Sequence, residues 1–376
     1  MTRILTTHTG SLPRPDDLLP LILDHEKRAP VDLAAFEARV RTAVADIVKQ
    51  QRETGLDVVN DGEQGKVDYS TYIKDRFTGY EGEPDSPLPG ADLKDFPEFA
   101  ARHPTGASRV LRPTCSGPIA WKDFSALEKD IANLKAAAQS AGAADVFMTA
   151  VSPGQAARFL GNRYYPTHEA YVFALADVLK REYAAIVNAG FALQIDCPDL
   201  ASGRNNQFQH LSLEEFRRVA AMHVDAVNHA AAGLPPERMR LHVCWGNYEG
   251  PHHKDVALRD IIDILLTARP AGLSVEGANP RHAHEWAVFE DVKLPAGKVL
   301  IPGVLDTTTN FIEHPELVAQ RIGQYARLVG RENVIAGVDC GFATFAVAPT
   351  IDPRIAWAKL GAMVEGARIA SQKLWK

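Results

Sequence analysis

Residues 238–246, RMRLHVCWG, form a short apolar run that carries two potential metal ligands, His242 and Cys244. In an extended strand, the side chains of residues i and i+2 project from the same side, so this spacing presents both ligands to one ion. A helix does not bring residues at that spacing onto one face. The run therefore predicts a strand that ends in a pair of ligands.

Seven further short, β-rich runs are spaced along the chain, and longer stretches with helical character separate them. They are ILTTHTG (4–10), GLDVVNDGE (55–63), ADVFMTAVS (144–152), FALQIDCPD (191–199), AGLSVEG (271–277), KVLIPGVLD (298–306) and NVIAGVDCG (333–341). Alternation of strands and helices predicts a mostly parallel sheet with helices outside it. Eight strands match a closed (β/α)₈ TIM barrel, so we expect an α/β fold of this type.

Two of the intervening stretches have clear helix signals. Residues 33–55 carry apolar residues at helical spacing, and Gly55 stands where a C-terminal cap would fall. Residues 212–233 repeat the pattern, with Ser212 in the N-cap position and Gly233 at the end.

The interval of about 64–144 is too long for a plain connection between a strand and a helix. It includes YEGEPDSPLPGADLKDFPEF (80–99), which is rich in proline, glycine and acidic residues. We expect a single barrel domain over residues 1–376, with a loop and hairpin excursion in this interval. The excursion either folds over the mouth of the barrel or is a surface insertion without a role.

Composition narrows the class of partner. A formal net charge of −6, without a long run of lysine or arginine, argues against nucleic acid and anionic membranes as partners and favours small molecules. The sequence shows neither a signal peptide nor an apolar segment long enough to span a bilayer. Only four cysteines occur, so we expect no disulfide framework, free thiols at Cys115 and Cys197, and a cytoplasmic location.

Active sites of (β/α)₈ barrels lie at the carboxyl ends of the strands. Glu276 and Cys340 end two of the apolar runs there, as His242 and Cys244 end another. Two thiolates, an imidazole and a carboxylate suit a zinc ion, whereas His242 and Cys244 alone would more often be a buried pair without a metal. The other histidine clusters, at residues 252–253 and 282–285, lie in loop or helix-start sequence, and we expect them to be solvated or to support the site.

Several motifs in order resemble the catalytic barrel of the cobalamin-independent methionine synthase family. They are HTGSLPRP (8–15), NDGEQGKVDYSTY (60–72), QIDCPDLA (194–201), LHVCWGN (241–247), SVEGANP (274–280), PGVLDTTTNFIEHPE (302–316) and GVDCGF (337–342). The resemblance implies a barrel of the type also used by uroporphyrinogen decarboxylase. It also implies a zinc ion held by His242, Cys244, Glu276 and Cys340, which activates the thiol of homocysteine as a bound thiolate.

The resemblance also implies a pocket for the amino acid part of homocysteine. Its elements would be backbone groups of Thr9, Gly10 and Ser11, with Glu63 and Asp196 as partners of the ammonium group and Asp68 as a further family acid. Two acids near one cation form a sound recognition device. The alternative for Glu63 is a surface acid, and for Asp196 it is a helix cap.

Three segments depart from the family pattern, and two of them bear on the alkyl donor. Where the family has an acid-x-histidine segment that supplies a proton, this chain has Asp306, Thr307 and Thr308. The family's Asp-Glu-Pro reads Asp196-Cys197-Pro198. The segment that carries a folate-stacking tryptophan in the family, SPGQAARFLGNRYYP (152–166), offers Tyr164 and Tyr165 as aromatic residues at its end.

The first hypothesis is a zinc-dependent S-methyltransferase that moves a methyl group from a folate or corrinoid donor to homocysteine or a similar small thiol. It would resemble the 5-methyltetrahydropteroyltriglutamate–homocysteine S-methyltransferases, and the resemblance also allows a corrinoid protein as a partner. The alternative is an epoxyalkane:coenzyme M transferase or another zinc-dependent thiol alkyltransferase, in which Arg14, Lys66 or Arg204 contacts a sulfonate. The third possibility is a decarboxylase-like or non-catalytic barrel in which these residues are structural.

Overall fold

The computed structural model describes residues 2–85, 88–103, 110–346 and 351–376. Its strands are β1 (Leu5–Thr6), β2 (Val58–Val59), β3 (Asp145–Val151), β4 (Ala192–Asp196), β5 (Met239–Val243), β6 (Gly272–Val275), β7 (Val299–Pro302) and β8 (Ile335–Ala336). Strands β2 to β7 pair in chain order as one parallel sheet, and β1 pairs in parallel with β8.

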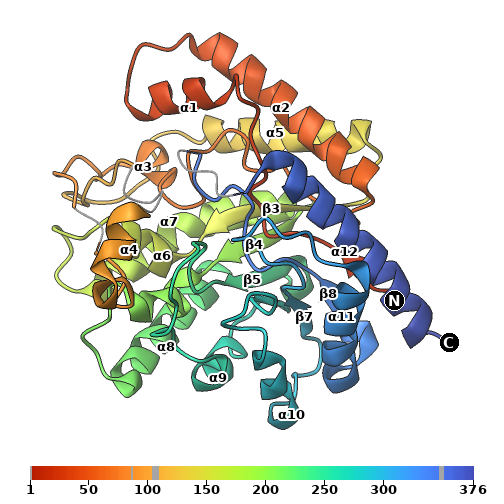
Figure 1. Cartoon of the computed structure of the whole chain (residues 1–376). Coiled ribbons are helices and arrows are strands. Elements are labelled where there is room, and N and C mark those ends of the chain that lie inside the picture. The colour runs from red at the N-terminus through yellow and green to blue at the C-terminus, as the bar shows by residue number, and fades with distance from the viewer. Residues whose placement is uncertain (1, 86–87, 104–109, 347–350) are drawn as a thin grey trace.

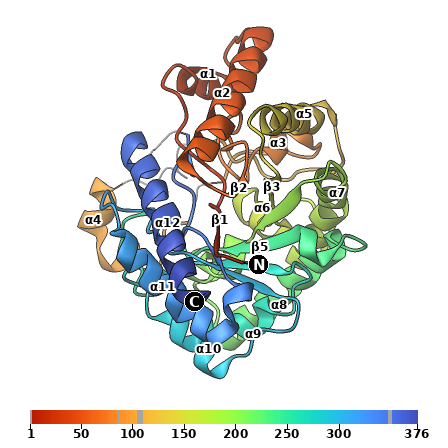
Figure 2. The ribbon, with the colours of Figure 1, turned by 90° about the vertical axis from the view of Figure 1, so that its right-hand side faces the viewer.

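The two sheets join into a ring. Backbone bridges connect Leu300 with Val334 and Gly303 with Gly337, which places β8 beside β7. At the other seam, the Asp57 N–H donates to the Thr6 carbonyl at 3.2 Å. The strands lie at the centre of the molecule with helices around them (Figure 2). The expected α/β barrel is therefore confirmed.

The helices follow the strands in turn. They are α1 (Leu19–Glu26), α2 (Leu33–Thr54), α3 (Ile73–Arg76), α4 (Pro97–Arg102), α5 (Ser125–Ser140), α6 (Pro153–Phe159), α7 (His168–Asn188), α8 (Leu213–Ala230), α9 (Ile262–Leu265), α10 (Val288–Asp291), α11 (Pro315–Val329) and α12 (Pro353–Leu374). Short 3₁₀ turns are η1 (Leu93–Asp95), η3 (Pro198–Leu200), η4 (Ser202–Asn205), η5 (Pro236–Arg238), η6 (Leu258–Asp260), η7 (Glu285–Ala287) and η8 (Arg331–Asn333). Among the described residues, no helix is long and apolar enough to cross a membrane.

The predicted helix ends hold with one adjustment. Helix α2 ends at Gly55 in the left-handed conformation, with φ +95°, which glycine adopts without a steric penalty. Helix α8 begins with a capping box, in which Ser212 and Glu215 satisfy each other's backbone N–H groups. It ends at Ala230, before the predicted Gly233, because the chain tightens there and the Ala232 N–H donates to the His229 carbonyl.

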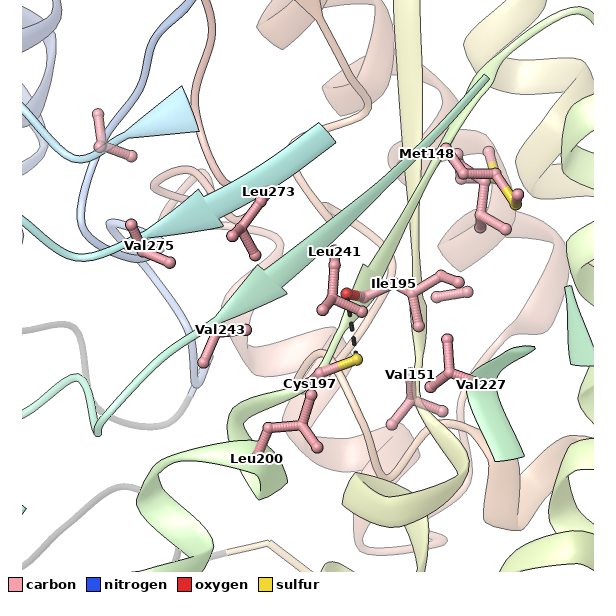
Figure 3. Close-up of a cluster of buried hydrophobic side chains, with 14 of the residues drawn as sticks. Met148, Val151, Ile195, Cys197, Leu200, Val227, Leu241, Val243, Leu273 and Val275 are labelled. Carbon is pink, nitrogen blue, oxygen red and sulfur yellow. Dashed lines mark hydrogen bonds between the residues drawn. The ribbon is translucent and has the colours of Figure 1, made fainter. Parts of the chain in front are cut away.

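The core lies between the outer face of the strands and the surrounding helices. Figure 3 shows Ile195, Leu241, Val243, Leu273 and Val275 gathered on this face, and each of them is buried. On β5 these apolar residues alternate with Arg240 and His242, which therefore project into the barrel. Because Leu241 and Val243 of this strand are buried against the helices, Arg240 and His242 point into the barrel.

In the chain, the irregular part of the excursion lies between β2 and α5, and its helices α3 and α4 lie on the left of the view in Figure 1. It contains α3, η1 and α4, and backbone hydrogen bonds pair residues 76–85 with residues 112–122 in antiparallel fashion, for example from the Ser116 N–H to the Gly79 carbonyl at 2.8 Å. Helix α5, which falls within the expected interval of 64–144, packs against α2 as a regular helix of the barrel. Residues 86–87 and 104–109 of the interval lie outside the described residues.

Candidate metal centre and substrate cavity

A cavity of about 1120 Å³ opens at the carboxyl ends of the strands. Seven of the residues singled out from the sequence line it: Thr9, Ser11, Glu63, Asp196, His242, Cys244 and Cys340. Gly10, Asp68 and Glu276 stand behind its wall. The excursion contributes to the rim through η1 and α4, so part of it lies at the barrel mouth.

His242, Cys244 and Cys340 form a cluster that could hold a metal ion. Their ligand atoms all lie within 4.8 Å of one another, and the two Sγ atoms are 3.4 Å apart. His242 Nδ1 lies 3.4 Å from Ser274 Oγ, whereas its Nε2 atom is buried without a hydrogen-bond partner. A buried ring nitrogen of this kind is costly unless something binds it.

The protonation state of the imidazole fits a ligand role. Burial, assisted by the charge of Arg240, lowers the pKa of His242 to about 3, so the ring is neutral and offers a lone pair. The pKa of Cys244 is raised, first by its hydrogen bond with Cys340 and then by burial. A bound cation reverses this effect on the thiols, since coordination favours the thiolate. The donor set therefore suits a thiophilic divalent metal.

Glu276 is buried close to this cluster, but its oxygens are engaged elsewhere. Oε1 accepts from the Trp245 N–H at 2.7 Å, and Oε2 accepts from Asn279 Nδ2 at 2.8 Å. The carboxylate is near enough to Cys244 for its charge to raise the pKa of that thiol. The structure therefore brings three of the four expected ligands together and keeps Glu276 beside them.

Two of the residues expected to hold the amino acid, Gly10 and Glu63, lie beside Thr149 of β3. Glu63 is 2% exposed, so it is no surface acid. Its Oε1 accepts from Thr149 Oγ1 at 3.1 Å, and its buried Oε2 has no partner. Gly10, with φ +147°, allows this approach, because a Cβ there would lie 2.7 Å from Glu63 Oε1.

Asp196 caps no helix; its orientation is fixed from inside the barrel. Gln194 Nε2 donates to Asp196 Oδ1 at 2.7 Å, and Arg240 Nε donates to Gln194 Oε1 at 2.8 Å. Burial raises the pKa of Glu63 to about 7 and also raises that of Asp196, whose pKa is further raised by the charge of Glu63. Two neighbouring buried carboxyls of this kind are suited to sharing one cationic group.

The remaining predicted residues have structural contacts. Thr9 Oγ1 donates to the Val338 carbonyl at 3.2 Å, and the Ser11 carbonyl accepts from the Phe342 N–H at 3.0 Å, which joins β1 to the turn after Cys340. Asp68 accepts from the backbone N–H groups of Ser70 and Thr71 at 2.6 and 2.7 Å. Its carboxylate thus shapes the loop and does not line the cavity.

The segment that supplies a proton in the family carries hydroxyl groups on the cavity wall here. Thr308 and Thr309 line the cavity, and both donate to Asp306 behind them. Asp306 itself is 6% exposed.

The histidines at 252 and 282 form a buried network behind the metal cluster. His282 Nδ1 lies 2.8 Å from Glu285 Oε2, and Asp255 lies between the rings of His252 and His282. Burial opposes the charge on His282, but hydrogen bonds to Asp255 and Glu285 raise its pKa to about 10. Its ring packs 4.5 Å from that of Trp245. This network supports the strand that carries Cys244.

Sequence reasoning missed other residues on the cavity wall. Tyr69, Phe159 and Phe345 line the cavity as an aromatic group, whereas Tyr164 and Tyr165 do not line it. Arg112 and Arg158 also line it, whereas Arg14, Lys66 and Arg204 do not. Tyr69 lies in one of the quoted motifs and Phe159 and Arg158 in a second, but no spacing rule indicates which residues of a loop face inward.

Comparison with known proteins decides the family. The family model described as the catalytic domain of cobalamin-independent synthase matches residues 163–368, more than half of the chain. The chain belongs to the cobalamin-independent methionine synthase family. The match covers the family's segments that carry His242, Cys244, Glu276 and Cys340, while Thr9 and Glu63 precede it.

Individual members of the family match over nearly the whole chain. The methionine synthase of Thermococcus kodakarensis is 24% identical over 372 residues, which cover 98% of this chain and 94% of the relative. That of Sulfolobus acidocaldarius is also 24% identical and covers 100% and 95%. A B12-independent methionine synthase of Shewanella sp. W3-18-1, solved in complex with selenomethionine, superposes with a TM-score of 0.75 at 19% identity, covering 99% of each chain. This likeness supports the barrel fold.

Proposed function

We propose that the protein is a zinc-dependent S-methyltransferase that methylates homocysteine or a similar small thiol. The observation that carries the proposal is the unpartnered Nε2 of His242, which lies beside two thiols at the mouth of the barrel. Membership of the methionine synthase family supports a methyltransferase. When bound, zinc would coordinate the thiol of the substrate and favour its thiolate at neutral pH.

The residues of the chain would divide the work between two parts of the cavity. His242, Cys244 and Cys340 would hold the metal, and Glu276, whose charge acts on Cys244, would be the fourth ligand. Glu63 and Asp196 would hold the ammonium group of the amino acid, since one oxygen of Glu63 has no partner. Backbone groups of residues 9–11 would meet its carboxylate.

The methyl donor would occupy a further part of the cavity, which aromatic side chains line. Structural relatives are described as B12-independent, which favours a methylated folate over a corrinoid as the donor. A corrinoid protein as a partner is therefore not favoured. Tyr69, Phe159 and Phe345 offer aromatic faces on which a flat donor could stack.

The alternative, an epoxyalkane:coenzyme M transferase, is less well supported. Arg14 donates to the carbonyls of Ala343, Glu63 and Lys66, and Lys66 donates to the Thr149 carbonyl. Arg204 donates to the carbonyls of Phe208 and Gln209. These three cations are thus engaged with the backbone and do not reach the cavity.

An assay panel tests the proposal. Purified protein loaded with zinc is incubated with homocysteine and, in separate reactions, methyltetrahydrofolate, methylcobalamin or epoxypropane with coenzyme M. Methionine should form with one of the methyl donors and disappear when a chelator removes the zinc. Alkylation of coenzyme M alone, or methionine formation that is unaffected by complete removal of zinc, would contradict the proposal.

A further inference from the structure

Two arginines stand together in the cavity wall, away from the groups assigned to the amino acid. Arg112 comes from the excursion, and Arg158 comes from α6. Both guanidinium groups lie over the ring of Phe159, at 3.8 Å for Arg112 and 5.4 Å for Arg158. Burial lowers the pKa of Arg112, and the charge of Arg158 lowers it further, so the two cations repel each other. Two cations so placed call for a negative partner.

The guanidinium group of Arg112 has N–H groups that donate no hydrogen bond. The residue is 6% exposed, and its Nε and Nη2 atoms are buried without a hydrogen-bond partner. It forms no ion pair within the described residues. Leaving a buried guanidinium unpaired is expensive, and the contact with the Phe159 face offsets only part of that cost. The side chain is therefore prepared for a group that arrives from the cavity.

Arg158 is held by neutral partners and keeps its charge free for a ligand. It donates to Gln155 Oε1 at 3.2 Å, to Ser202 Oγ at 2.7 Å and to Asn206 Oδ1. No carboxylate of the described residues pairs with it. Burial lowers the pKa of Arg158, and Cys244 is among the groups whose charge opposes this effect, so Arg158 lies within electrostatic range of the cluster of His242, Cys244 and Cys340.

Asp68, the acid whose charge acts on Arg112, does not form an ion pair with it. Asp68 interacts with Arg112 through space, but its oxygens accept from the backbone N–H groups of Ser70 and Thr71 and from their hydroxyls. The carboxylate stays more than an ion-pair distance away from the guanidinium. The arginine pair thus remains a positive region in the wall.

We propose that Arg112 and Arg158 form an oxyanion-binding subsite for the second substrate, the alkyl donor. The ligand class is a carboxylate or sulfonate attached to a flat apolar body. A guanidinium matches such a planar anion through paired N–H donors. The inference rests on the proposed function for the identity of the second substrate, but anion binding itself does not depend on turnover.

The aromatic residues of the cavity wall are the reason for proposing a ligand with a flat body. The rings of Phe159 and Phe345 are stacked with centroids 6.5 Å apart, and Tyr69 lies 6.1 Å from Phe159. Phe159 thus contacts both arginines and the remaining aromatic rings. A ligand that stacks on these rings would bring an oxyanion at its end to Arg112.

Binding of small anions to the zinc-loaded protein tests the subsite. The probes are p-aminobenzoylglutamate for a carboxylate, benzenesulfonate for a sulfonate and inorganic phosphate, each titrated by calorimetry without thiol or methyl donor. Arg112→Met should weaken binding of the preferred probe about ten- to a hundredfold, as expected for loss of a charged hydrogen bond. Arg259→Met, which removes an exposed arginine paired with Asp291, should change binding less than about twofold.

The probe that binds identifies the chemical source of the anion, and phosphate alone would overturn the carboxylate or sulfonate class. Equal affinities in Arg112→Met and Arg259→Met, or no binding of any probe by the wild type at millimolar concentration, would overturn the subsite. If Arg112→Met does not fold, Arg112→Lys replaces it and should weaken binding by about three- to tenfold, because the charge stays and the paired donors are lost. Zinc content should be unchanged in these variants, so weaker binding of the probe reports on the arginine subsite and not on loss of the metal. Because the probes bind without turnover, a failure of the proposed methyl transfer would leave this binding result unchanged.

Discussion

At the scale of single residues, two unpartnered atoms describe the site better than any motif. His242, whose Nε2 has no hydrogen-bond partner, clusters with the thiols of Cys244 and Cys340. Glu63, whose Oε2 also has no partner, lines the cavity. Buried polar atoms are normally hydrogen-bonded, so each of these positions indicates a ligand. The first suits a metal, and the second suits a cation such as an ammonium group.

Replacement of a thiol ligand should release the metal. Cys340→Ser removes a thiolate that zinc prefers to a hydroxyl, so zinc content measured by mass spectrometry should fall well below one ion per chain and methyl transfer should be lost. Cys115→Ser is the matched control, because Cys115 is a buried free cysteine whose Sγ donates to the Gly117 carbonyl. Full zinc occupancy in Cys340→Ser would remove this thiol from the metal site.

The pH dependence of amino acid binding should follow Glu63. Burial raises its pKa from the ordinary 4.5 to about 7, and only the ionised form attracts an ammonium group. Affinity for methionine, which has no titrating thiol, should therefore increase as the pH rises through about 7 and should lose this dependence in Glu63→Gln. Glu249→Gln, which changes an exposed acid on the cavity rim, should keep the dependence. A profile that is the same in all three proteins would exclude Glu63 as the partner.

The raised pKa of Glu63 also affects stability, which should decrease with rising pH while affinity for the amino acid increases. The folded protein retains a proton on Glu63 that the unfolded chain releases between pH 4.5 and about 7. This contribution to the free energy of unfolding is complete below pH 4.5 and is lost as the pH rises through about 7. The proposed binding of an ammonium group at neutral pH thus uses a carboxyl group whose ionised form is disfavoured by the fold.

At the scale of elements, the turn after β6 is organised by a residue of the turn after β8. Asp339 accepts from the backbone N–H groups of Gly277, Ala278 and Asn279 at 2.8 to 2.9 Å. Asn279 in turn donates to both Asp339 and Glu276. The carboxylate therefore ties the turn of Glu276 to that of Cys340.

Asp339→Asn should weaken both the fold and the metal site. An amide keeps one acceptor oxygen and turns a donor toward backbone N–H groups, which should cost about 1–3 kcal/mol in the free energy of unfolding. Urea denaturation measures this cost, and zinc titration should show weaker binding. Asp225→Asn, at an exposed position of α8, should behave as the wild type. Unchanged stability and zinc affinity would show that Asp339 positions nothing.

The periodicity of strands explains why the strand order and the inward direction of two metal ligands could be predicted from the sequence. Alternation along β5 determines that His242 and Cys244 face inward, and the strand order follows the chain because consecutive strands are usually neighbours in a sheet. Alternation does not determine the rotamer of Glu276, which depends on the Trp245 N–H and on Asn279. Arg112 belongs to an irregular excursion whose backbone pairing has no sequence period, so its place in the cavity wall emerges only from the folded chain.

At the scale of the whole molecule, the metal cluster links parts of the barrel that are far apart in the chain. Cys244 and Cys340 are separated by 96 residues, and they follow strands that are not neighbours. The N-terminal segment joins the same assembly, since the Ile4 N–H donates to Ser371 Oγ of α12 at 2.9 Å. A metal at this point should therefore stabilise the closed barrel as a unit.

Removal of the metal should lower the melting temperature. A ligand present at a thousand times its dissociation constant stabilises the folded state by about 4 kcal/mol, which corresponds to roughly 5 °C for a chain of this size. Differential scanning calorimetry with and without a chelator measures the change, and zinc should restore the original value. Cys340→Ser should show no response to either addition; an equal response in that variant would place the stabilising metal elsewhere.

X-ray absorption at the zinc edge tests the central claim, that the cluster binds a metal in order to bind the thiol of a substrate. Without substrate, the zinc shell should contain the two sulfurs of Cys244 and Cys340 with lighter ligands from His242 and Glu276. On addition of homocysteine, the shell should gain a third sulfur. A shell that stays the same at saturating homocysteine would contradict the account and would leave a structural metal in its place.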